Sequence, residues 1–269
     1  MGDGDAHRLA AIALAELARP DLVAWWPLLR AAGSPLALFE SSDSELHGLG
    51  VSARAIALLR AGRKAKDAER HLEHCRRLAM SVTWPGRPDY PALLMEISDP
   101  PLALFYKGRT PAWARPMLSI VGSRRATRYG TRTAETLAAE AAKAGAVVVS
   151  GLAAGIDSAA HRGALSVGAS VAVVAGGLDL GRWGRKRGLY DRLLATGSLV
   201  SEQRPGLAPL PRLFPVRNRI ITGMSPVTVV IEAARRSGSL VSARLAAEQG
   251  REVFAVPGNL DSKVSEGTN

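Results

Sequence analysis

Three apolar runs that each end on glycine constrain the fold of this chain more than any other feature. The runs and their glycines are Met117–Val121 before Gly122, Val147–Ser150 before Gly151, and Val171–Ala175 before Gly176 and Gly177. Short apolar runs with this ending are typical of buried parallel strands, whose carboxyl ends open onto one crevice. Glycine there lets a ligand approach the backbone, and the helix N-terminus behind it offers unpaired N–H groups and partial positive charge. The pattern therefore predicts a crevice that binds phosphate.

Strands and helices alternate from residue 117 onward. Further strands are expected at Leu199–Ser201, Thr228–Ile231 and Glu252–Val256. The helices expected between the strands are Tyr129–Ala144, Ile156–Val167, Tyr190–Thr196, Pro215–Thr222 and Leu240–Gln249. About six strands joined in this way predict an α/β fold, a Rossmann-like, doubly wound and mostly parallel sheet with right-handed crossovers.

The first 80 residues have the pattern of a small all-α domain. Helical periodicity begins at Leu9, and Gly48-Leu49-Gly50 fits the turn of a helix-hairpin-helix (SAM-like) domain. Glycines in such a turn direct backbone amides toward a phosphate; the alternative is a helical bundle that uses them only as a tight turn. Several prolines between positions 85 and 101 exclude a long helix in the next segment. The predicted domains are residues 1–80, a connector with short strands at 81–116, and the Rossmann-like domain at 117–269.

Charge is distributed unevenly along the sequence. The net charge is +11, and residues 117–256 carry 19 Lys and Arg against 9 Asp and Glu, whereas residues 1–80 carry 11 against 10. An excess of positive charge in one domain indicates a polyanionic partner, most commonly nucleic acid. The alternative is coding bias, since Arg outnumbers Lys 29 to 6. Bias alone does not explain why basic residues exceed acidic ones in one domain only.

The cysteine content and the apolar runs point to a cytoplasmic location. The single cysteine, Cys75, excludes an internal disulfide and suits a reducing compartment. No apolar run approaches the roughly 20 residues that span a bilayer. The start M-G-D-G-D-A-H lacks the basic residues and the apolar stretch of a signal peptide. We therefore expect a cytoplasmic protein with no membrane partner.

Basic and small polar residues cluster at the predicted strand ends. Arg124 is the first cation after the strand that ends at Gly122, and F-P-V-R-N-R places Arg217, Asn218 and Arg219 at the start of a helix. Arginine grips phosphate and stacks on bases, and asparagine bonds base edges. Phe214 offers a stacking face or belongs to the core, and Ser237-Gly238-Ser239 supplies hydroxyls and amides to the crevice. This interpretation requires Arg124 and Arg219 to face the same cleft.

Motifs for catalysis, cofactors and metals are sparse. The chain has neither a G-x-G-x-x-G fingerprint after the first parallel strand nor a Walker A motif, which disfavours NAD binding and P-loop hydrolysis. Asp157 and His161 are spaced for an acid/base pair, but a capping Asp157 and a structural His161 are the favoured interpretation. His71, His74 and Cys75 suggest a metal site or, in the favoured interpretation, a solvated helix face from Lys64 to Arg77. We expect no catalytic residue, no cofactor and no metal.

Ordered blocks of sequence extend this pattern from residue 89 to residue 259. They are D-Y-P-A-L-L, P-P-L-A-L-F-Y-K-G, I-V-G-S-R at 120–124, S-G-L-A-A-G-I-D-S-A-A-H-R-G-A-L at 150–165, V-A-G-G-L-D at 174–179, S-E-Q-R-P-G at 201–206, F-P-V-R-N-R-I-I-T-G-M-S at 214–225, S-G-S-L-V-S-A at 237–243 and V-F-A-V-P-G-N at 253–259. Together these blocks resemble the DNA-processing protein A family (DprA, also called Smf). The likeness covers roughly residues 80–269 and is looser in the helical N-terminal region.

The resemblance implies a Rossmann-like domain that binds single-stranded DNA, forms a homodimer and carries out no chemical step. Members of that family protect incoming DNA strands during natural transformation and help to load the RecA recombinase. Carried onto this chain, the DNA contacts implied are Gly122, Ser123, Arg124, Gly151, Gly155, Gly176, Gly177, Arg217, Asn218, Arg219, Ser237, Gly238 and Ser239. Positive charge that follows a backbone, with loose base contacts, suits sequence-tolerant binding of single strands.

Two departures from the family pattern stand out. After G-G-L-D the family usually continues into Y-P and a short helix, whereas this chain has L-G-R-W-G-R-K-R-G-L-Y-D. The basic residues between Arg182 and Arg187 either add phosphate contacts or belong to a disordered loop. The chain also ends at G-T-N where the family continues into a further helix and often a winged-helix domain, which predicts a fragment or a truncated chain.

Two other functions fit parts of the sequence. One is a nucleotide-processing enzyme on a related fold, such as a nucleoside-monophosphate glycosidase, but those enzymes carry P-G-G-x-G-T-x-x-E. The comparable stretch here, R-S-G-S-L-V-S-A, lacks the glutamate. The other is a structural nucleoid-associated protein, for which duplex DNA would compete as well as single strands.

Overall fold

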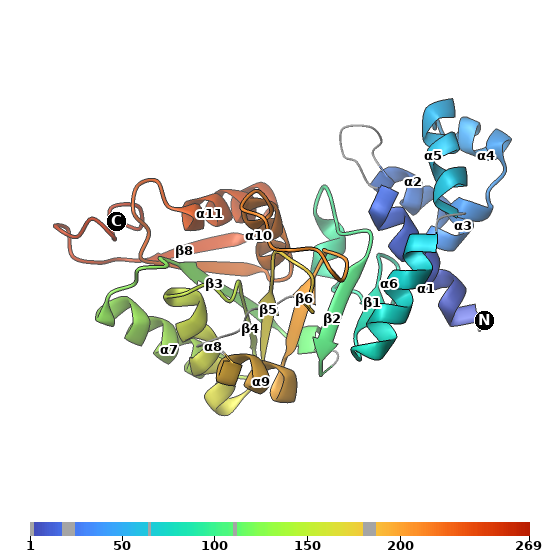
Figure 1. The fold of residues 1–269 in the computed structure, drawn as a ribbon. Coiled ribbons are helices and arrows are strands. Elements are labelled where there is room, and N and C mark those ends of the chain that lie inside the picture. Colours follow the sequence, from blue (N-terminus) through green and yellow to red (C-terminus); the bar gives the residue numbers. More distant parts are fainter. Residues whose placement is uncertain (1–2, 18–24, 64–65, 110–111, 180–186) are drawn as a thin grey trace.

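An eight-stranded sheet runs through the computed structural model, which describes residues 3–17, 25–63, 66–109, 112–179 and 187–269 (Figure 1). The strands are β1 (Ser81–Thr83), β2 (Leu104–Gly108), β3 (Met117–Gly122), β4 (Val147–Ser150), β5 (Ser170–Val173), β6 (Ser198–Ser201), β7 (Val227–Ile231) and β8 (Glu252–Val256). Their order in the sheet is β1-β2-β6-β5-β4-β3-β7-β8. Strands β3 to β8 form a parallel set, and β1 and β2 join it antiparallel at one edge. The predicted α/β fold with a mostly parallel sheet is confirmed.

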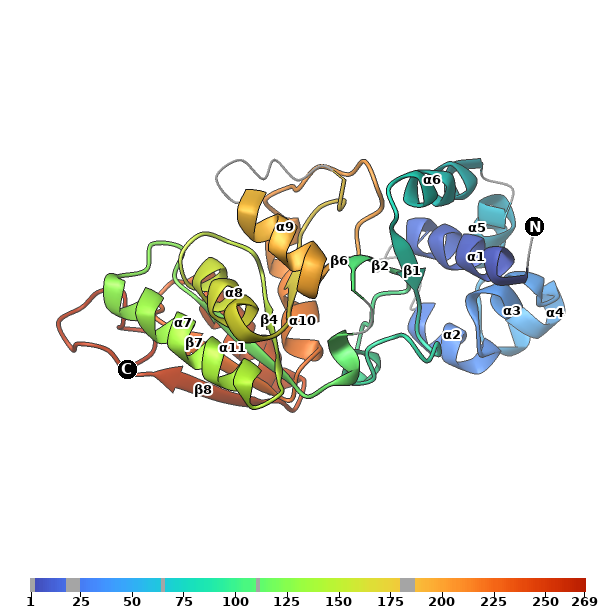
Figure 2. The same cartoon turned by 90° about the horizontal axis from the view of Figure 1, so that it is seen from below.

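Helices cover both faces of the parallel part of the sheet. α7 (Arg128–Lys143), α8 (Ile156–Val167) and α9 (Arg187–Thr196) lie on one face, and α10 (Leu213–Gly223) and α11 (Gly238–Glu248) lie on the other (Figures 1 and 2). Every residue of β4, β5 and β6 is buried as a result. Burial on two faces explains why these strands read as continuous apolar runs without alternation.

The sheet has a topological switch point between β3 and β7. From β3 the chain adds β4, β5 and β6 in turn on one side, and it then returns to place β7 and β8 on the other side of β3. The loops after β3 and β7 therefore leave the sheet toward opposite faces and open a crevice at the carboxyl edge. Ligands of open α/β sheets bind at this kind of position.

The predicted connector is built into the sheet. β1 pairs with β2, and β2 pairs antiparallel with β6 in the register Phe105↔Ser201. Short 3₁₀ helices η1 (Leu93–Glu96) and η2 (Ala112–Ala114) follow β1 and β2. Trp113 of η2 lies edge-on to Tyr106 of β2, with ring centroids 5.2 Å apart. β1 and β2 thus form one edge of the sheet.

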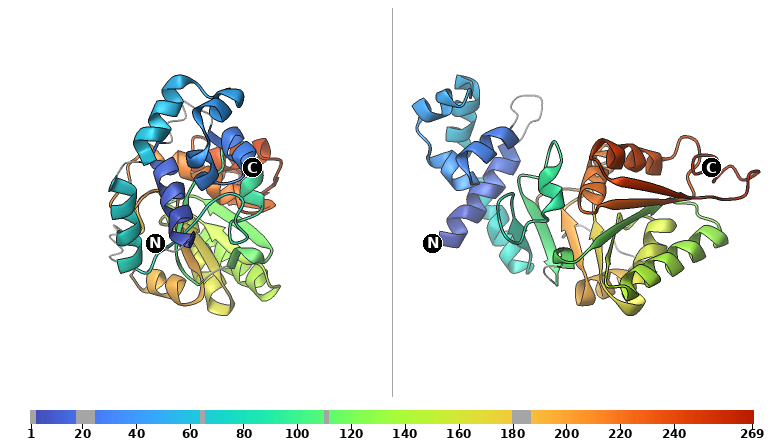
Figure 3. Two further views of the ribbon diagram at one scale, coloured as in Figure 1. Left: turned by 90° about the vertical axis from the view of Figure 1, so that its right-hand side faces the viewer. Right: turned by 180° about the vertical axis from the view of Figure 1, so that it is seen from behind.

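The N-terminal helices pack against that edge of the sheet, at one end of the molecule (Figure 3). They are α1 (Asp3–Leu17), α2 (Trp25–Ala32), α3 (Pro35–Glu40), α4 (Asp43–Gly48), α5 (Ala53–Arg63) and α6 (Lys66–Arg77). A single apolar cluster contains Ile12 of α1, Leu72 of α6, Trp84 and Phe105 of β2. The helical region and the sheet edge therefore share one hydrophobic core.

The turn at Gly48-Leu49-Gly50 joins α4 to α5, as its pattern predicts. The amide of Leu49 donates to Glu45 O (3.1 Å), that of Gly50 to His47 O (2.9 Å) and that of Val51 to Leu46 O (3.0 Å). Because α4 itself takes up these donors, they do not face a phosphate. The geometry supports the alternative in which the glycines only form a tight turn.

The expectation of a solvated face along α6 is wrong for two of its residues. His71 is 6% exposed and Cys75 is 1% exposed, and both lie on the side of α6 that packs on the protein interior. His71 pairs with Glu16 of α1 and accepts from Nη1 of Arg204 at 3.2 Å. Spacing explains the difference, since Ala68, His71, Leu72 and Cys75 share one helical stripe.

Three further findings concern membranes, metals and the basic segment. Within the described residues, no helix is both long and apolar enough to cross a membrane. The same residues hold no group of three or more His, Cys, Asp or Glu side chains suited to a metal ion. The positions 182–186 of the basic segment lie outside the described residues, and Arg187 begins α9, where its Nε lies 3.1 Å from Asp191 Oδ1.

Candidate nucleic-acid interface

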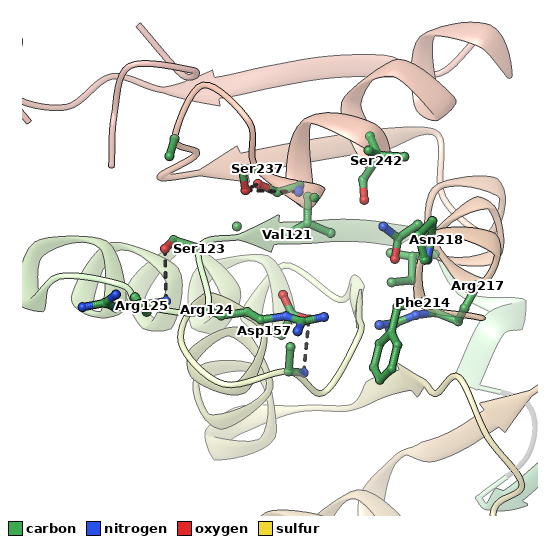
Figure 4. Close-up of a pocket in the computed structure, with 18 of the residues that line it drawn as sticks. Val121, Ser123, Arg124, Arg125, Asp157, Phe214, Arg217, Asn218, Ser237 and Ser242 are labelled. Atoms are coloured by element: carbon green, nitrogen blue, oxygen red, sulfur yellow. Dashed lines mark hydrogen bonds between the residues drawn. The ribbon is translucent and has the colours of Figure 1, made fainter. Parts of the chain in front are cut away.

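An open pocket of about 840 Å³ lies at the switch point. The loop from β3 to α7 forms one wall, α10 forms a second, and the N-terminus of α11 forms a third (Figure 4). The structure brings these predicted residues together in its lining: Gly122, Ser123, Arg124, Arg217, Asn218, Ser237, Gly238 and Ser239. Phe214 and Asp157 line the same pocket.

The loop after β3 places an exposed arginine over an aromatic ring. The Ser123 hydroxyl accepts from the Arg125 amide (3.1 Å), which turns the chain tightly. Arg124 then extends toward Asp157 and Phe214, whereas Arg125, which also lines the pocket, extends in the opposite direction (Figure 4). The guanidinium carbon of Arg124 lies 5.2 Å from the centroid of the half-buried Phe214 ring. Among the described residues no carboxylate forms an ion pair with Arg124, so its charge remains available for a ligand.

Gly155 packs against the backbone of that loop at Ser123 and Arg124. Its φ is +77°, and a Cβ at this position would overlap the Ser123 carbonyl oxygen and the Arg124 backbone. The next amide, that of Ile156, donates to Ser123 O at 3.1 Å. Only glycine meets both the left-handed conformation and the close approach. Gly155 therefore shapes the site through packing and lies beneath its lining.

Arg217 is a buried cation at the inner end of the pocket. It is 6% exposed, its Nη1 donates to Val173 O (2.6 Å), and its buried Nε has no hydrogen-bond partner within the described structure. The pKa of the Arg217 guanidinium is lowered to about 10, mainly because the group is buried. The negative charge of Asp157 raises this pKa, and the positive charge of Arg124 lowers it further. Arg217 is still protonated at neutral pH. A Cβ at Gly151 would overlap Arg217, so that glycine makes room for the guanidinium.

The N-terminus of α11 faces the pocket opposite Arg124. Ser237 caps this helix by accepting from the Ser239 amide at 3.3 Å, and the two serine hydroxyls lie 2.7 Å apart. Space beside the Gly238 Cα is open. Ser242 and Asn218 complete this side (Figure 4). Hydroxyls and helix-end amides together form an environment that favours anions.

Five predicted residues do not line the pocket: Gly151 and Gly155, which pack behind it, and Arg219, Gly176 and Gly177. Arg219 lies on the other side of α10, where Nε donates to Asp99 (2.7 Å) and Nη2 to Glu202 (2.5 Å). Burial lowers the pKa of Arg219, but these two carboxylates outweigh burial and raise it overall. Gly176 and Gly177 pack against the 204–209 loop. The requirement that Arg124 and Arg219 face one cleft therefore fails, and of the two arginines predicted on α10 only Arg217 lines the pocket.

The capping role expected of Asp157 is not seen, since the N-cap of α8 is Gly155 and no side chain caps this helix. Asp157 Oδ2 accepts from the Ala153 amide at 3.2 Å, which closes the turn before α8. His161 is fully buried, with Nδ1 2.7 Å from the hydroxyl of Ser170. One polar residue beside the site was not found from the sequence. Glu232, directly after β7, is 3% exposed. Its carboxylate accepts a hydrogen bond from the amide of Thr127, the N-cap residue of α7.

The doubly wound sheet with an open pocket at its switch point places this chain among the open α/β folds, in which ligands bind outside the carboxyl ends of the strands. The family model of DNA recombination-mediator protein A matches residues 81–269, and the chain belongs to this family. Protein Smf of Escherichia coli strain K12 is 42% identical over 226 residues, which cover 79% of this chain and 60% of that protein. DNA processing protein DprA of Streptococcus pneumoniae strain R6 is 41% identical over 179 residues, or 66% of this chain and 63% of that protein.

Solved structures of two relatives share this fold. The X-ray structure of DprA from Streptococcus pneumoniae superposes with a TM-score of 0.81 and 31% identity, over 96% of this chain and 90% of that one. A structure that concerns the single-stranded DNA binding mode of DNA processing protein A from Helicobacter pylori gives a TM-score of 0.64 and 30% identity, over 69% of this chain and 84% of that one. The chain spans less than two thirds of the length of these curated relatives from Escherichia coli and Streptococcus pneumoniae.

Proposed function

We propose that this chain binds single-stranded DNA in the pocket at the switch point, without a chemical step. The observation that carries this proposal is the placement of Arg124. Its guanidinium is exposed, has no carboxylate partner among the described residues, and lies over the Phe214 ring across from the N-terminus of α11. A flexible polyanion whose bases are unpaired is the ligand that satisfies all three features.

Each part of the pocket has a role in this proposal. Arg124 and the amides and hydroxyls of Ser237–Ser239 bind phosphate oxygens, and the buried charge of Arg217 adds to the positive potential. The Phe214 face accepts a base by stacking. Stacking and charge tolerate any base, whereas Asn218 is the lining residue that bonds a base edge. Binding should therefore depend weakly on sequence.

The relatives support this ligand. DNA processing protein A of Helicobacter pylori has a structurally described single-stranded DNA binding mode, and its fold covers 69% of this chain. By analogy we propose that the whole protein processes incoming DNA in the cytoplasm during natural transformation, protects the strand as a homodimer and helps to load RecA. RecA loading and dimerisation are extensions of the family resemblance beyond the pocket itself.

A salt series of oligonucleotide binding tests the proposal. Fluorescence anisotropy of labelled single-stranded and duplex oligonucleotides of equal length gives both affinities at each salt concentration. We expect tighter binding of the single strand, with a logarithmic salt slope of about −0.7 for each neutralised phosphate. Equal affinity for duplex would favour a nucleoid-associated role, and no binding of either would overturn the proposal.

The absence of a chemical step has a separate test. The purified chain incubated with nucleoside monophosphates should release no free base, as measured by chromatography. RecA loading is tested by adding the chain to RecA and a single strand coated with single-strand-binding protein. The expected result is a shorter lag in RecA filament formation, and an unchanged lag would limit the function to binding.

A further inference from the structure

Glu232 is the residue that follows β7 at the switch point, and its carboxylate lies inside the protein. It is 3% exposed, and its backbone φ is +55°. This left-handed conformation is unfavourable for a side chain of this size, so the surrounding contacts must hold the residue there. A buried acid in a basic domain, beside a candidate anion site, calls for a physical explanation.

The carboxylate occupies the N-terminus of α7, the first helix of the doubly wound unit. Oε2 accepts from the amide of Thr127 at 2.8 Å, and Oε1 accepts from the hydroxyl of the same residue. That hydroxyl in turn accepts from the Gly130 amide at 3.1 Å. A Cβ at Gly130 would overlap the Glu232 carboxylate, so the helix leaves open the space that the acid fills.

This position has a known use in folds of this type. The N-terminus of the helix after the first strand is where doubly wound sheets present amides to the phosphates of a nucleotide. In this chain a side chain of the protein already supplies the anion. A ligand phosphate there would meet the negative charge of Glu232 and would find the Thr127 amide already bonded.

We propose that Glu232 is a built-in anion that replaces a ligand phosphate at the N-terminus of α7 and thereby directs the ligand to the pocket between Arg124 and α11. Glu232 is thus a specificity-determining and positioning residue for the proposed single-strand site, and the identity of the ligand rests on the proposed function. It also fixes the loop that carries Arg124. That loop is held at its start by the hydrogen bond from the Ile156 amide to Ser123 O (3.1 Å) and at its end by Glu232.

Chemical rescue of Glu232→Ala tests this inference, since acetate replaces the atoms that the substitution removes. Oligonucleotide affinity and the melting temperature are measured for the wild type, Glu232→Ala and the control Glu252→Ala, an exposed acid at the start of β8. Sodium acetate is compared with sodium chloride at the same ionic strength. We expect Glu232→Ala to bind the single strand about fivefold more weakly, because the loop loses an anion at a helix N-terminus. Acetate should restore the affinity and raise the melting temperature of this variant only.

Wild-type affinity in Glu232→Ala, or an equal response to acetate in all three proteins, would overturn the inference. Should Glu232→Ala not fold, Glu232→Gln keeps the volume but loses the charge, and it should bind the single strand more weakly than the wild type. Wild-type affinity in that variant would also overturn the inference. The melting-temperature arm needs no DNA, so it still tests Glu232 if the wild type fails to bind single strands and the proposed function is wrong.

Discussion

The loops at the carboxyl edge of the sheet form two regions that look alike in sequence and differ in charge balance. The loops after β3 and β7, with α10, keep Arg124 exposed and Arg217 only partly compensated in an open pocket. The described parts of the loops after β5 and β6 lie toward the N-terminal helices, and several of their polar groups pair within the protein. Arg204 bonds His71, and the Gly206 amide bonds both carboxylate oxygens of Asp179 at 3.0 Å.

The comparison of these regions indicates that an arginine near the crevice is available to a ligand only where no carboxylate of the protein pairs with it. Arg217 and Arg219 are two residues apart on α10, yet one lines the pocket and the other neutralises Asp99 and Glu202. In the proposed function, the first region receives the negative charge of the bound strand. The second holds the helical N-terminal region against the sheet.

Gly155→Ala should have the largest effect, because it disturbs the pocket through the backbone. The new Cβ would sit at a φ of +77° and overlap the Ser123 carbonyl oxygen. We expect a loss of about 2–4 kcal/mol in the free energy of unfolding, together with a loss of about tenfold in single-strand affinity. Denaturant titration and anisotropy measure the two quantities. Gly238→Ala, whose Cβ meets open space, should keep the stability; an equally stable Gly155→Ala would contradict the packing described here.

Arg124→Ala should weaken binding with no cost in stability. We expect about tenfold lower affinity, equal for all base sequences, and a salt slope that becomes shallower by about 0.7. Arg244→Ala is the matched control, since it removes the same charge from an exposed position on α11, outside the pocket lining. Equal losses in the two variants would mean that only the overall charge matters and that the pocket is not the site.

Arg219→Ala should show the opposite pattern. The substitution leaves Asp99 and the largely buried Glu202 without their partner, and we expect about 2–3 kcal/mol lower free energy of unfolding. Single-strand affinity should stay within about twofold of the wild type, since the pocket is untouched. A large loss of affinity in a folded Arg219→Ala protein would mean that the strand also contacts the region around Arg219, and that the two regions form one binding site.

The smallest expected effect concerns Cys75, which lies beside the second region, where the loops after β5 and β6 meet the N-terminal helices. Burial, with a contribution from the charge of Asp179, raises the pKa of the Cys75 thiol to about 12. We expect no reaction with a thiol reagent at pH 8 until the protein unfolds. Between pH 9 and 12 the unfolded chain loses this proton while the native chain keeps it, so the thiol lowers stability as the pH rises. Rapid native labelling would show that this region opens.

Much of the fold could be predicted because burial leaves a local signature. β4 was expected at Val147–Ser150 and α8 at Ile156–Val167, and both have these bounds in the structure. A strand covered on both faces must be apolar throughout, and glycine marks its end. Ala68, His71, Leu72 and Cys75 on α6 have the same kind of spacing, but the charged residues between them favour the wrong expectation of a solvated face.

The parts that could not be predicted depend on partners distant in the sequence. Asp99 is 120 residues from Arg219, and Glu232 is 105 residues from Thr127. β2 joins the sheet by pairing with β6 across a comparable separation. No local pattern shows which arginine acquires a counter-ion or which acid fills a helix end, because these facts arise only when the chain folds.

Hydrogen exchange with and without a single-stranded oligonucleotide tests the central claim most directly. The amides of Ser123–Arg125 and Ser237–Ser239 should exchange more slowly when the strand is bound, since they border the pocket. The amides of Gly176–Asp179 and Arg204–Leu207 should be unchanged. Slowing confined to the second set would contradict the account, because the strand would then occupy the region whose charges are already balanced.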